Sequence, residues 1–129
     1  RRGLETPVGP GQSSAMITIY HKPTCSTSRK VLQMIRDAGH EPEIIDYGRD
    51  GWTRAQLLGL LAAADVTARE ALRVKGTDAE ERGLLEAGDE DILAAMVENP
   101  LLVERPFVCG PGGVRLCRPA ELVVETFRR

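Results

Sequence analysis

The sequence lacks any apolar run long enough to cross a membrane. Its longest apolar stretch, residues 57–64, is interrupted by Gly59 and ends at Asp65, far short of the roughly 20 residues that a spanning helix needs. The N-terminus carries charge but no hydrophobic segment, so a secretory signal is not expected. We therefore expect a cytoplasmic protein that has no membrane partner, with residues 57–64 forming a buried helix.

An excess of basic residues is also missing. The chain has 17 Lys and Arg against 19 Asp and Glu, for a net charge of -2. Because duplex-binding domains usually carry a basic excess, a nucleic-acid partner is not expected. Among the basic residues, 14 are Arg and 3 are Lys. Two explanations are open for this bias. One is genomic composition, and the other is that a few arginines hold an oxyanion through the paired donors of the guanidinium group.

Cysteine and histidine are scarce. The three cysteines are Cys25, Cys109 and Cys117, and an odd number without a signal argues against a disulfide framework and for a reducing compartment. No two cysteines have the spacing of a metal site, and the only histidines are His21 and His40. The sequence therefore predicts neither a zinc site nor another bound metal.

The length of 129 residues suits one compact domain. Residues 1–15 are rich in Gly, Pro and Ser and show no periodicity, which is typical of a flexible leader or a cloning remnant. Met16 is then the expected native start. Residues 16–129 are expected to form a single domain.

The structured part opens with a strand, a helix and a strand. Residues 16–20 alternate and are rich in β-formers, residues 25–38 have apolar positions at helical spacing before Gly39, and residues 43–47 are again strand-like. A crossover of this length favours parallel pairing of the two strands.

The middle of the chain, about residues 48–100, is predicted to be a helical insertion without strands. The first expected helix runs from the cap Thr53 to about residue 63, and the second runs from the cap Thr67 to about Val74, with Glu70 completing a capping box. A short third helix starts at Thr77 or Asp78, and a fourth runs from Asp89 to about residues 99–100.

The last section reads as a hairpin and a helix. Residues 106–109 and 114–117 are strand-like and flank a turn at 110–113, and a helix is expected from Pro119, at its first position, to about residue 127. The resulting α/β order, β-α-β, insertion, β-β-α, is the thioredoxin-like plan, with a mixed four-stranded sheet and helices on both faces.

Cys25 lies where the first strand gives way to the first helix. The unpaired N–H groups and the dipole of a helix start favour a thiolate over a thiol. Neighbouring hydroxyls, among them Ser28, can add donors, and Arg29 stands one helical turn further on. The alternative is a small buried cysteine, but its neighbours Pro, Thr and Ser are not those of a core residue.

The spacing around Cys25 argues against other thiol enzymes. Ser28 stands where a dithiol oxidoreductase has its second cysteine, and Val31 stands where a tyrosine-phosphatase loop needs arginine. A Cys-His protease is weakly supported, because His21 is too near in sequence to carry much weight. His21 either tunes this loop or is an exposed loop histidine.

Four blocks of sequence resemble the glutaredoxin-dependent arsenate reductases, and the resemblance runs from about residue 17 to residue 127. The blocks are His-Lys-Pro-Thr-Cys-Ser-Thr-Ser-Arg (21–29), Arg-Glu-Ala-Leu-Arg (69–73), Glu-Arg-Pro (104–106) and Arg-Leu-Cys-Arg-Pro (115–119). The resemblance implies that Cys25 attacks arsenate as a thiolate, that glutathione adds to the adduct, and that glutaredoxin reduces it and releases arsenite. Glutathione is then a co-substrate, and no cofactor is bound.

The resemblance also assigns roles to residues outside the first block. Arg73, Arg105 and Arg118 match the arginines that hold the oxyanion, although each alone reads equally as a surface ion pair. Pro106 matches a proline whose peptide bond is cis and which lies beside the active thiol. His21, Ser28 and Arg29 are expected to support the site.

Two cysteines and two other functions complete the predictions. Cys117 is expected to be structural or accessory, and Cys109 to be a packing residue. A redox adaptor that binds RNA polymerase is one alternative function, but it carries a Cys-x-x-Cys that Ser28 interrupts here. The other is a relative with the same fold and cysteine that acts on another substrate, for example a glutathione-dependent reductase; such relatives tend to depart from the block at 115–119.

Overall fold

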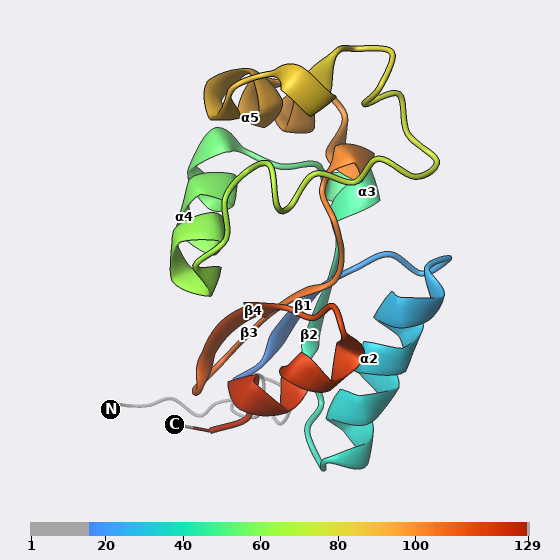
Figure 1. Cartoon of the computed structure of the whole chain (residues 1–129). Coiled ribbons are helices and arrows are strands. Elements are labelled where there is room, and N and C mark those ends of the chain that lie inside the picture. The colour runs from blue at the N-terminus through green and yellow to red at the C-terminus, as the bar shows by residue number, and fades with distance from the viewer. Residues whose placement is uncertain (1–15, 129) are drawn as a thin grey trace.

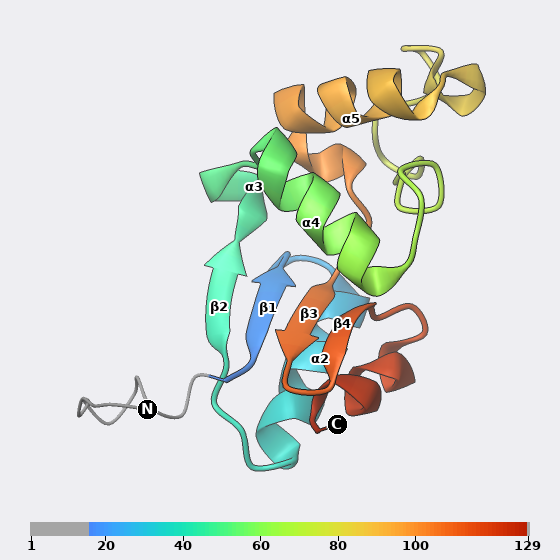
Figure 2. The same ribbon diagram turned by 90° about the vertical axis from the view of Figure 1, so that its left-hand side faces the viewer.

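The computed structural model describes residues 16–128. A four-stranded sheet at its centre has the order β2-β1-β3-β4 (Figure 2). Its strands are β1 (Thr18–His21), β2 (Glu43–Asp46), β3 (Phe107–Gly110) and β4 (Gly113–Leu116). β1 pairs with β2 in parallel and with β3 antiparallel, and β3 and β4 form an antiparallel hairpin. The predicted mixed sheet is confirmed. The division into a leader at residues 1–15 and a single domain at residues 16–129 stays a prediction, because residues 1–15 lie outside the described part.

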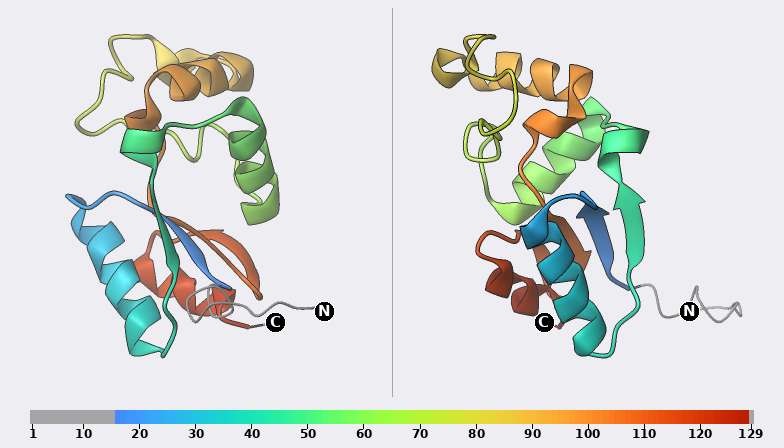
Figure 3. Two further views of the ribbon diagram at one scale, coloured as in Figure 1. Left: turned by 180° about the vertical axis from the view of Figure 1, so that it is seen from behind. Right: turned by 90° about the vertical axis from the view of Figure 1, so that its right-hand side faces the viewer.

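One face of the sheet is covered by α2 (Ser26–Asp37) and the 3-10 helix η3 (Ala120–Thr126), as the two views of Figure 3 show. Val31 and Ile35 lie one helical turn apart on α2 and are fully buried against Ile19 and Val108 of the sheet. Because both helices pack here, the N-terminal end of α2 is fixed at the edge where β1 ends.

The other face carries the helical insertion (Figure 1). Its elements are α3 (Tyr47–Asp50), α4 (Arg54–Ala64), the 3-10 helix η1 (Leu84–Glu86), α5 (Asp89–Glu98) and the 3-10 helix η2 (Pro100–Leu102). Their apolar side chains form one core with Phe107 of β3. In the described residues no helix is long and apolar enough to span a membrane.

Helix starts in the insertion follow the predicted capping chemistry. Thr53 caps α4 and forms a reciprocal capping box with Gln56. α5 begins at the predicted Asp89, although Gly88 occupies the cap position. Local hydrogen bonding by short polar side chains therefore sets the start of α4, whereas α5 begins without a side-chain cap.

Three predicted helices are wrong in extent or type. Thr67 and Glu70 do form the capping box, but the chain makes only a turn before Leu72 forms a bridge with Val103. The expected helix from residue 77 or 78 is a series of turns ending in η1. The last helix is a 3-10 helix that Pro119 caps rather than begins.

The bridge at Leu72 explains why the helix predicted from Thr67 to about Val74 does not form beyond a turn. The Arg73 N–H donates to the Leu102 carbonyl, and the Glu104 N–H donates to the Ala71 carbonyl, both at 2.7 Å. These bonds replace the helical partners that residues 71–73 would otherwise use. They bring Arg73 next to the segment that leads into β3.

Candidate active site

Cys25 is the cap residue of α2. Its backbone is extended, with φ -92° and ψ 124°, and its carbonyl accepts the first helical hydrogen bond, from the Arg29 N–H at 3.0 Å. The turn before it closes with a bond from the Cys25 N–H to the Lys22 carbonyl at 2.9 Å. The sulfur is therefore placed over the free N–H groups of the first helical turn.

The surroundings of the Cys25 sulfur lower its pKa below the usual range of a thiol. Burial alone raises the pKa, but the backbone N–H of Ser28, the side chain of Arg105 and the backbone N–H of Thr27 outweigh it. Each of these groups stabilises the thiolate, which is the nucleophilic form. The predicted ionised cysteine thus has both a helix start and a guanidinium beside it.

A buried hydrogen-bond network supports the loop before α2. The Nδ1 atom of His21 lies 2.6 Å from the Ser28 hydroxyl oxygen, which also accepts from the Lys22 N–H at 3.1 Å. His21 is 6% exposed, so the reading as a surface histidine is wrong. Burial lowers the pKa of His21, although the charge of Asp46 acts to raise it. The neutral ring can therefore accept a hydrogen bond from the Ser28 hydroxyl.

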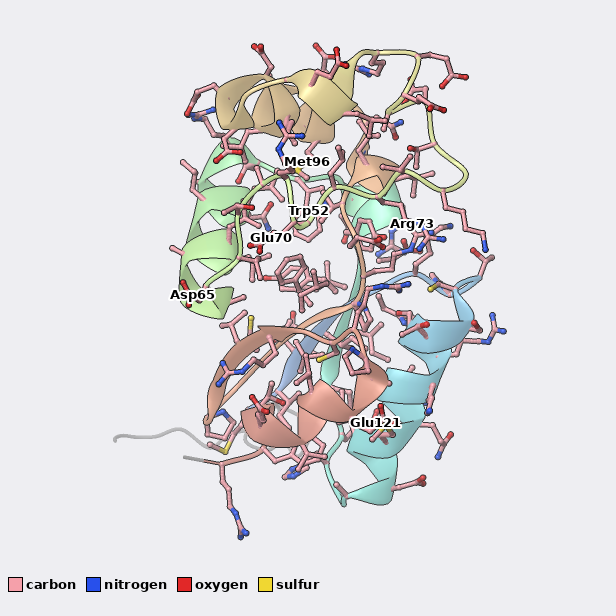
Figure 4. All side chains as sticks on the ribbon, in the orientation of Figure 1. Trp52, Asp65, Glu70, Arg73, Met96 and Glu121 are labelled. Carbon is pink, nitrogen blue, oxygen red and sulfur yellow. The ribbon has the colours of Figure 1, made fainter. Side chains whose placement is uncertain are left out.

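The three predicted arginines line one pocket with Cys25. The pocket has a volume of about 380 Å³ and is lined by Thr24, Cys25, Ser26, Thr27, Arg73, Lys75, Arg105 and Arg118. Arg73 follows the Leu72 bridge, Arg105 precedes β3, and Arg118 follows β4. Figure 4 shows Arg73 on the side of the insertion that faces the first turn of α2.

Each arginine is held by a backbone carbonyl. Arg118 donates to the carbonyl of Arg105 at 3.0 Å, Arg73 donates to that of Lys75 at 3.1 Å, and Arg105 donates to that of Leu101 at 3.4 Å. Arg105 is only 7% exposed, and its buried Nε has no protein partner. A buried guanidinium with spare donors is suited to an anionic ligand.

Pro106 lies next to Arg105 as expected, and the Arg105–Pro106 peptide bond is cis. Its carbonyl accepts from the Cys117 N–H at 2.9 Å, which ties the segment to the end of β4. The Arg118–Pro119 bond is also cis. Two of the three arginines therefore immediately precede a cis proline.

Arg29, a predicted supporting residue, does not line the pocket. Its side chain is exposed and donates to the Pro23 carbonyl at 3.0 Å. Its charge contributes to lowering the pKa of His21 rather than that of Cys25. In the structure the Arg29 side chain therefore contacts the outer side of the loop through Pro23. A supporting role for Arg29 stays a prediction.

Three further side chains line the pocket or contact its arginines, and none of them is a predicted site residue. Lys75 lines the pocket. The Glu104 carboxylate pairs with two of the arginines, Arg73 at 3.2 Å and Arg118 at 3.7 Å. Tyr47 is buried, and burial raises its pKa to about 12 while Arg105 lowers it. Glu104 stands inside the Glu-Arg-Pro block, which was the one available signal.

The other two cysteines differ from Cys25 in position and chemistry. Cys109 is paired with Thr18, at the opposite end of β1 from Cys25. Cys117 is fully buried, which raises its pKa to about 12. All three cysteines are free thiols. Among residues 16–128, no cluster of His, Cys, Asp or Glu could hold a metal ion.

Comparison with known proteins identifies the family of the chain. Residues 20–126 match the model of the ArsC family. An arsenate reductase of Synechocystis sp. is 58% identical over 85% of this chain and 80% of its own length, and that of Rhizobium meliloti is 50% identical over 84% and 79%. The structure of an arsenate reductase from Vibrio cholerae superposes with a TM-score of 0.81 at 34% identity, covering 88% of this chain and 99% of that one.

Proposed function

The chain belongs to the ArsC family, and on that premise we propose that it reduces arsenate to arsenite with Cys25 as the nucleophile. The observation that carries the proposal is the joint placement of a cysteine with a lowered pKa and three arginines in one pocket. A thiolate needs cations to bring a dianion of the same sign within bonding distance.

The first step forms a bond between sulfur and arsenic. The Cys25 thiolate attacks the arsenic atom, one As–O bond breaks, and the departing oxygen takes up protons and leaves as water. Arsenic stays in the +5 state. The backbone N–H groups of Ser28 and Thr27, which hold the sulfur negative, are released from that charge as the bond forms.

The arginines hold the remaining oxygens of arsenate. Arg105 is the pocket arginine whose side chain lowers the pKa of Cys25, and we assign it to the oxygens next to the attacked face. Arg73 and Arg118 close the pocket from the insertion and from the end of β4. Because guanidinium groups pair with oxyanions in a fixed geometry, they orient arsenate as well as neutralise it.

The reductant comes from outside the chain in this proposal. Glutathione replaces a second oxygen on arsenic. A glutaredoxin thiol then attacks the glutathione sulfur to form a mixed disulfide, and the electron pair of the S–As bond reduces arsenic to the +3 state. Water finally releases arsenite and the Cys25 thiolate. The remoteness of Cys109 and the burial of Cys117 favour an external thiol over an internal one, and a reducing cytoplasm would keep all three thiols free.

A redox adaptor is less well supported. Such a protein needs a second cysteine three residues after the first, whereas Ser28 is fully buried here and hydrogen-bonded to His21. Its hydroxyl maintains the loop and cannot form a disulfide. We therefore retain the enzyme as the proposed function.

A coupled assay tests the proposal. Arsenate, glutathione, glutaredoxin and glutathione reductase are mixed with the protein, and NADPH consumption is followed. Cys25→Ser should reduce turnover to the background rate, and the matched variant Cys109→Ser should keep the wild-type rate. Turnover that survives Cys25→Ser would remove this sulfur from the reaction. Wild-type turnover with glutathione but no glutaredoxin would refute only the identity of the reductant.

A further inference from the structure

Glu104 is an anion that contacts two of the arginines lining the pocket, although it does not line the pocket itself. One of its carboxylate oxygens lies 3.2 Å from the Arg73 guanidinium and 3.7 Å from that of Arg118. The side chains are 19%, 15% and 33% exposed for Glu104, Arg73 and Arg118. This pair of contacts is therefore better shielded from solvent than surface ion pairs such as Lys30–Glu121 and Arg54–Glu90, whose side chains are 49% to 75% exposed.

The backbone builds this contact into the fold. Hydrogen bonds on both sides of the Leu72–Val103 bridge join Arg73 to Leu102 and Glu104 to Ala71. Arg118 is fixed separately through the carbonyl of Arg105. The two arginines therefore reach the same carboxylate from segments 45 residues apart, without depending on flexible surface side chains.

We propose that Glu104 is a positioning and specificity-determining residue that acts through Arg73 and Arg118, as an internal anion with which the substrate oxyanion competes. The inference rests on the proposed function of the pocket. In the free protein the carboxylate holds both guanidinium groups toward the pocket. An entering dianion must draw them from Glu104 to itself, and the charge of Glu104 opposes its entry.

Competition of this kind separates substrate from product by charge. Arsenate is a dianion near neutral pH and can displace one carboxylate from two guanidinium groups. Arsenite is an uncharged acid and cannot displace it. A monoanion gains less than a dianion from the same exchange. Glu104 therefore weakens every oxyanion complex, but it favours release of the neutral product and disfavours singly charged ligands.

The variant Glu104→Gln isolates the charge. Its amide oxygen still accepts from Arg73 and Arg118, so their placement is kept while the negative charge is removed. Glu125→Gln is the matched control, because it removes one carboxylate from an arginine pair, with Arg115 at 2.8 Å, outside the pocket. Glu104→Asp keeps the charge on a shorter side chain.

Two measurements test the proposal. The first is the Kd of inorganic sulfate, obtained from protection of Cys25 against iodoacetamide, with circular dichroism to confirm folding. The second is the KM and kcat for arsenate in the coupled assay. We expect Glu104→Gln to lower both the Kd of sulfate and the KM of arsenate by roughly three- to tenfold, as expected for a partly shielded charge, without raising kcat. Glu125→Gln and Glu104→Asp should not tighten sulfate.

The outcomes separate this inference from the proposed function. If Glu104 only braces the arginines, Glu104→Gln will leave the Kd of sulfate unchanged or raise it, and either result overturns the inference. If the wild-type protein binds sulfate but does not reduce arsenate, the proposed function fails, and the change in sulfate affinity still decides the role of Glu104.

Discussion

The two halves of the pocket are assembled in different ways. One half, the loop and helix start at residues 21–28, is a single contiguous stretch whose backbone N–H groups at Thr27 and Ser28 hold the Cys25 sulfur. The other half consists of Arg73, Arg105 and Arg118, which come from three separate segments and are held by backbone carbonyls. The local half, together with Arg105, sets the ionisation of the Cys25 sulfur, and the three arginines set the affinity for an anion.

This division has a physical consequence. The contiguous half is formed as soon as α2 packs on the sheet, because each of its bonds closes a short loop. The distant half exists only when the insertion, β3 and the end of β4 have all been placed. Substitutions in the contiguous half should therefore lower the reactivity of the thiol and the stability of the fold. Substitutions in the distant half should weaken the binding and orientation of the anion.

The largest effect is expected from the arginines. Arg105→Ala or Arg118→Ala should raise KM for arsenate and lower kcat, for a loss in kcat/KM of about 10²- to 10³-fold, because a charged donor is lost in both the bound and the transition state. Steady-state kinetics in the coupled assay measure this change. Unchanged kinetics in both variants would contradict the arginine half of the pocket.

A smaller effect is expected in the local half. Ser28→Ala removes a buried hydroxyl that bonds to His21 and to the Lys22 N–H, and should lower the free energy of unfolding by about 1–3 kcal/mol. Urea unfolding measures this change, with Ser26→Ala, at an exposed position of the same turn, as the control. Equal stability of the two variants would show that the network does not hold the loop.

Tyr47 joins the two halves and should give a moderate kinetic effect. It is stacked on Trp52 at 5.1 Å, and its buried hydroxyl lies beside Arg105. Tyr47→Phe should weaken the placement of Arg105 and lower kcat/KM by roughly two- to tenfold, with a raised pKa of Cys25 in the alkylation profile. Tyr20→Phe, in the same aromatic cluster, should leave that pKa in place.

The smallest effect concerns pH. Burial lowers the pKa of His21, so the unfolded chain binds a proton at higher pH than the folded one. Stability should therefore fall as pH drops below about 6.5, the ordinary value for histidine, by less than about 1.4 kcal/mol per pH unit. Urea unfolding at pH 7 and pH 5 should show a smaller fall for His21→Asn than for the wild type. An equal fall would place the titrating group elsewhere.

The sequence predicts most of the contiguous half because its determinants are local. The strand, the loop and the start of α2 follow from alternation, Pro23 and the apolar spacing after Cys25. Capping boxes at Thr53 and Thr67 are equally readable. The hairpin follows from the glycines at 110–113, whose last member, Gly113, adopts φ +124°.

The distant half was readable only through family resemblance. The helix predicted at 67–74 stops early because residues 71–73 bond to residues 102–104, a pairing that no local pattern records. The same pairing brings Glu104 to Arg73. The sequence predicts Tyr47 at the end of a strand, whereas it begins α3 and is buried. Contacts between segments far apart in sequence decide each of these features.

The pH dependence of Cys25 alkylation tests the central claim most directly. Iodoacetamide modification of the folded protein, read by mass spectrometry at each cysteine, should give Cys25 a pKa below the ordinary thiol value of about 8.5, while buried Cys117 stays unmodified. Arg105→Ala should move the pKa of Cys25 upward. A pKa of Cys25 at or above the ordinary value, unchanged by loss of Arg105, would contradict the account.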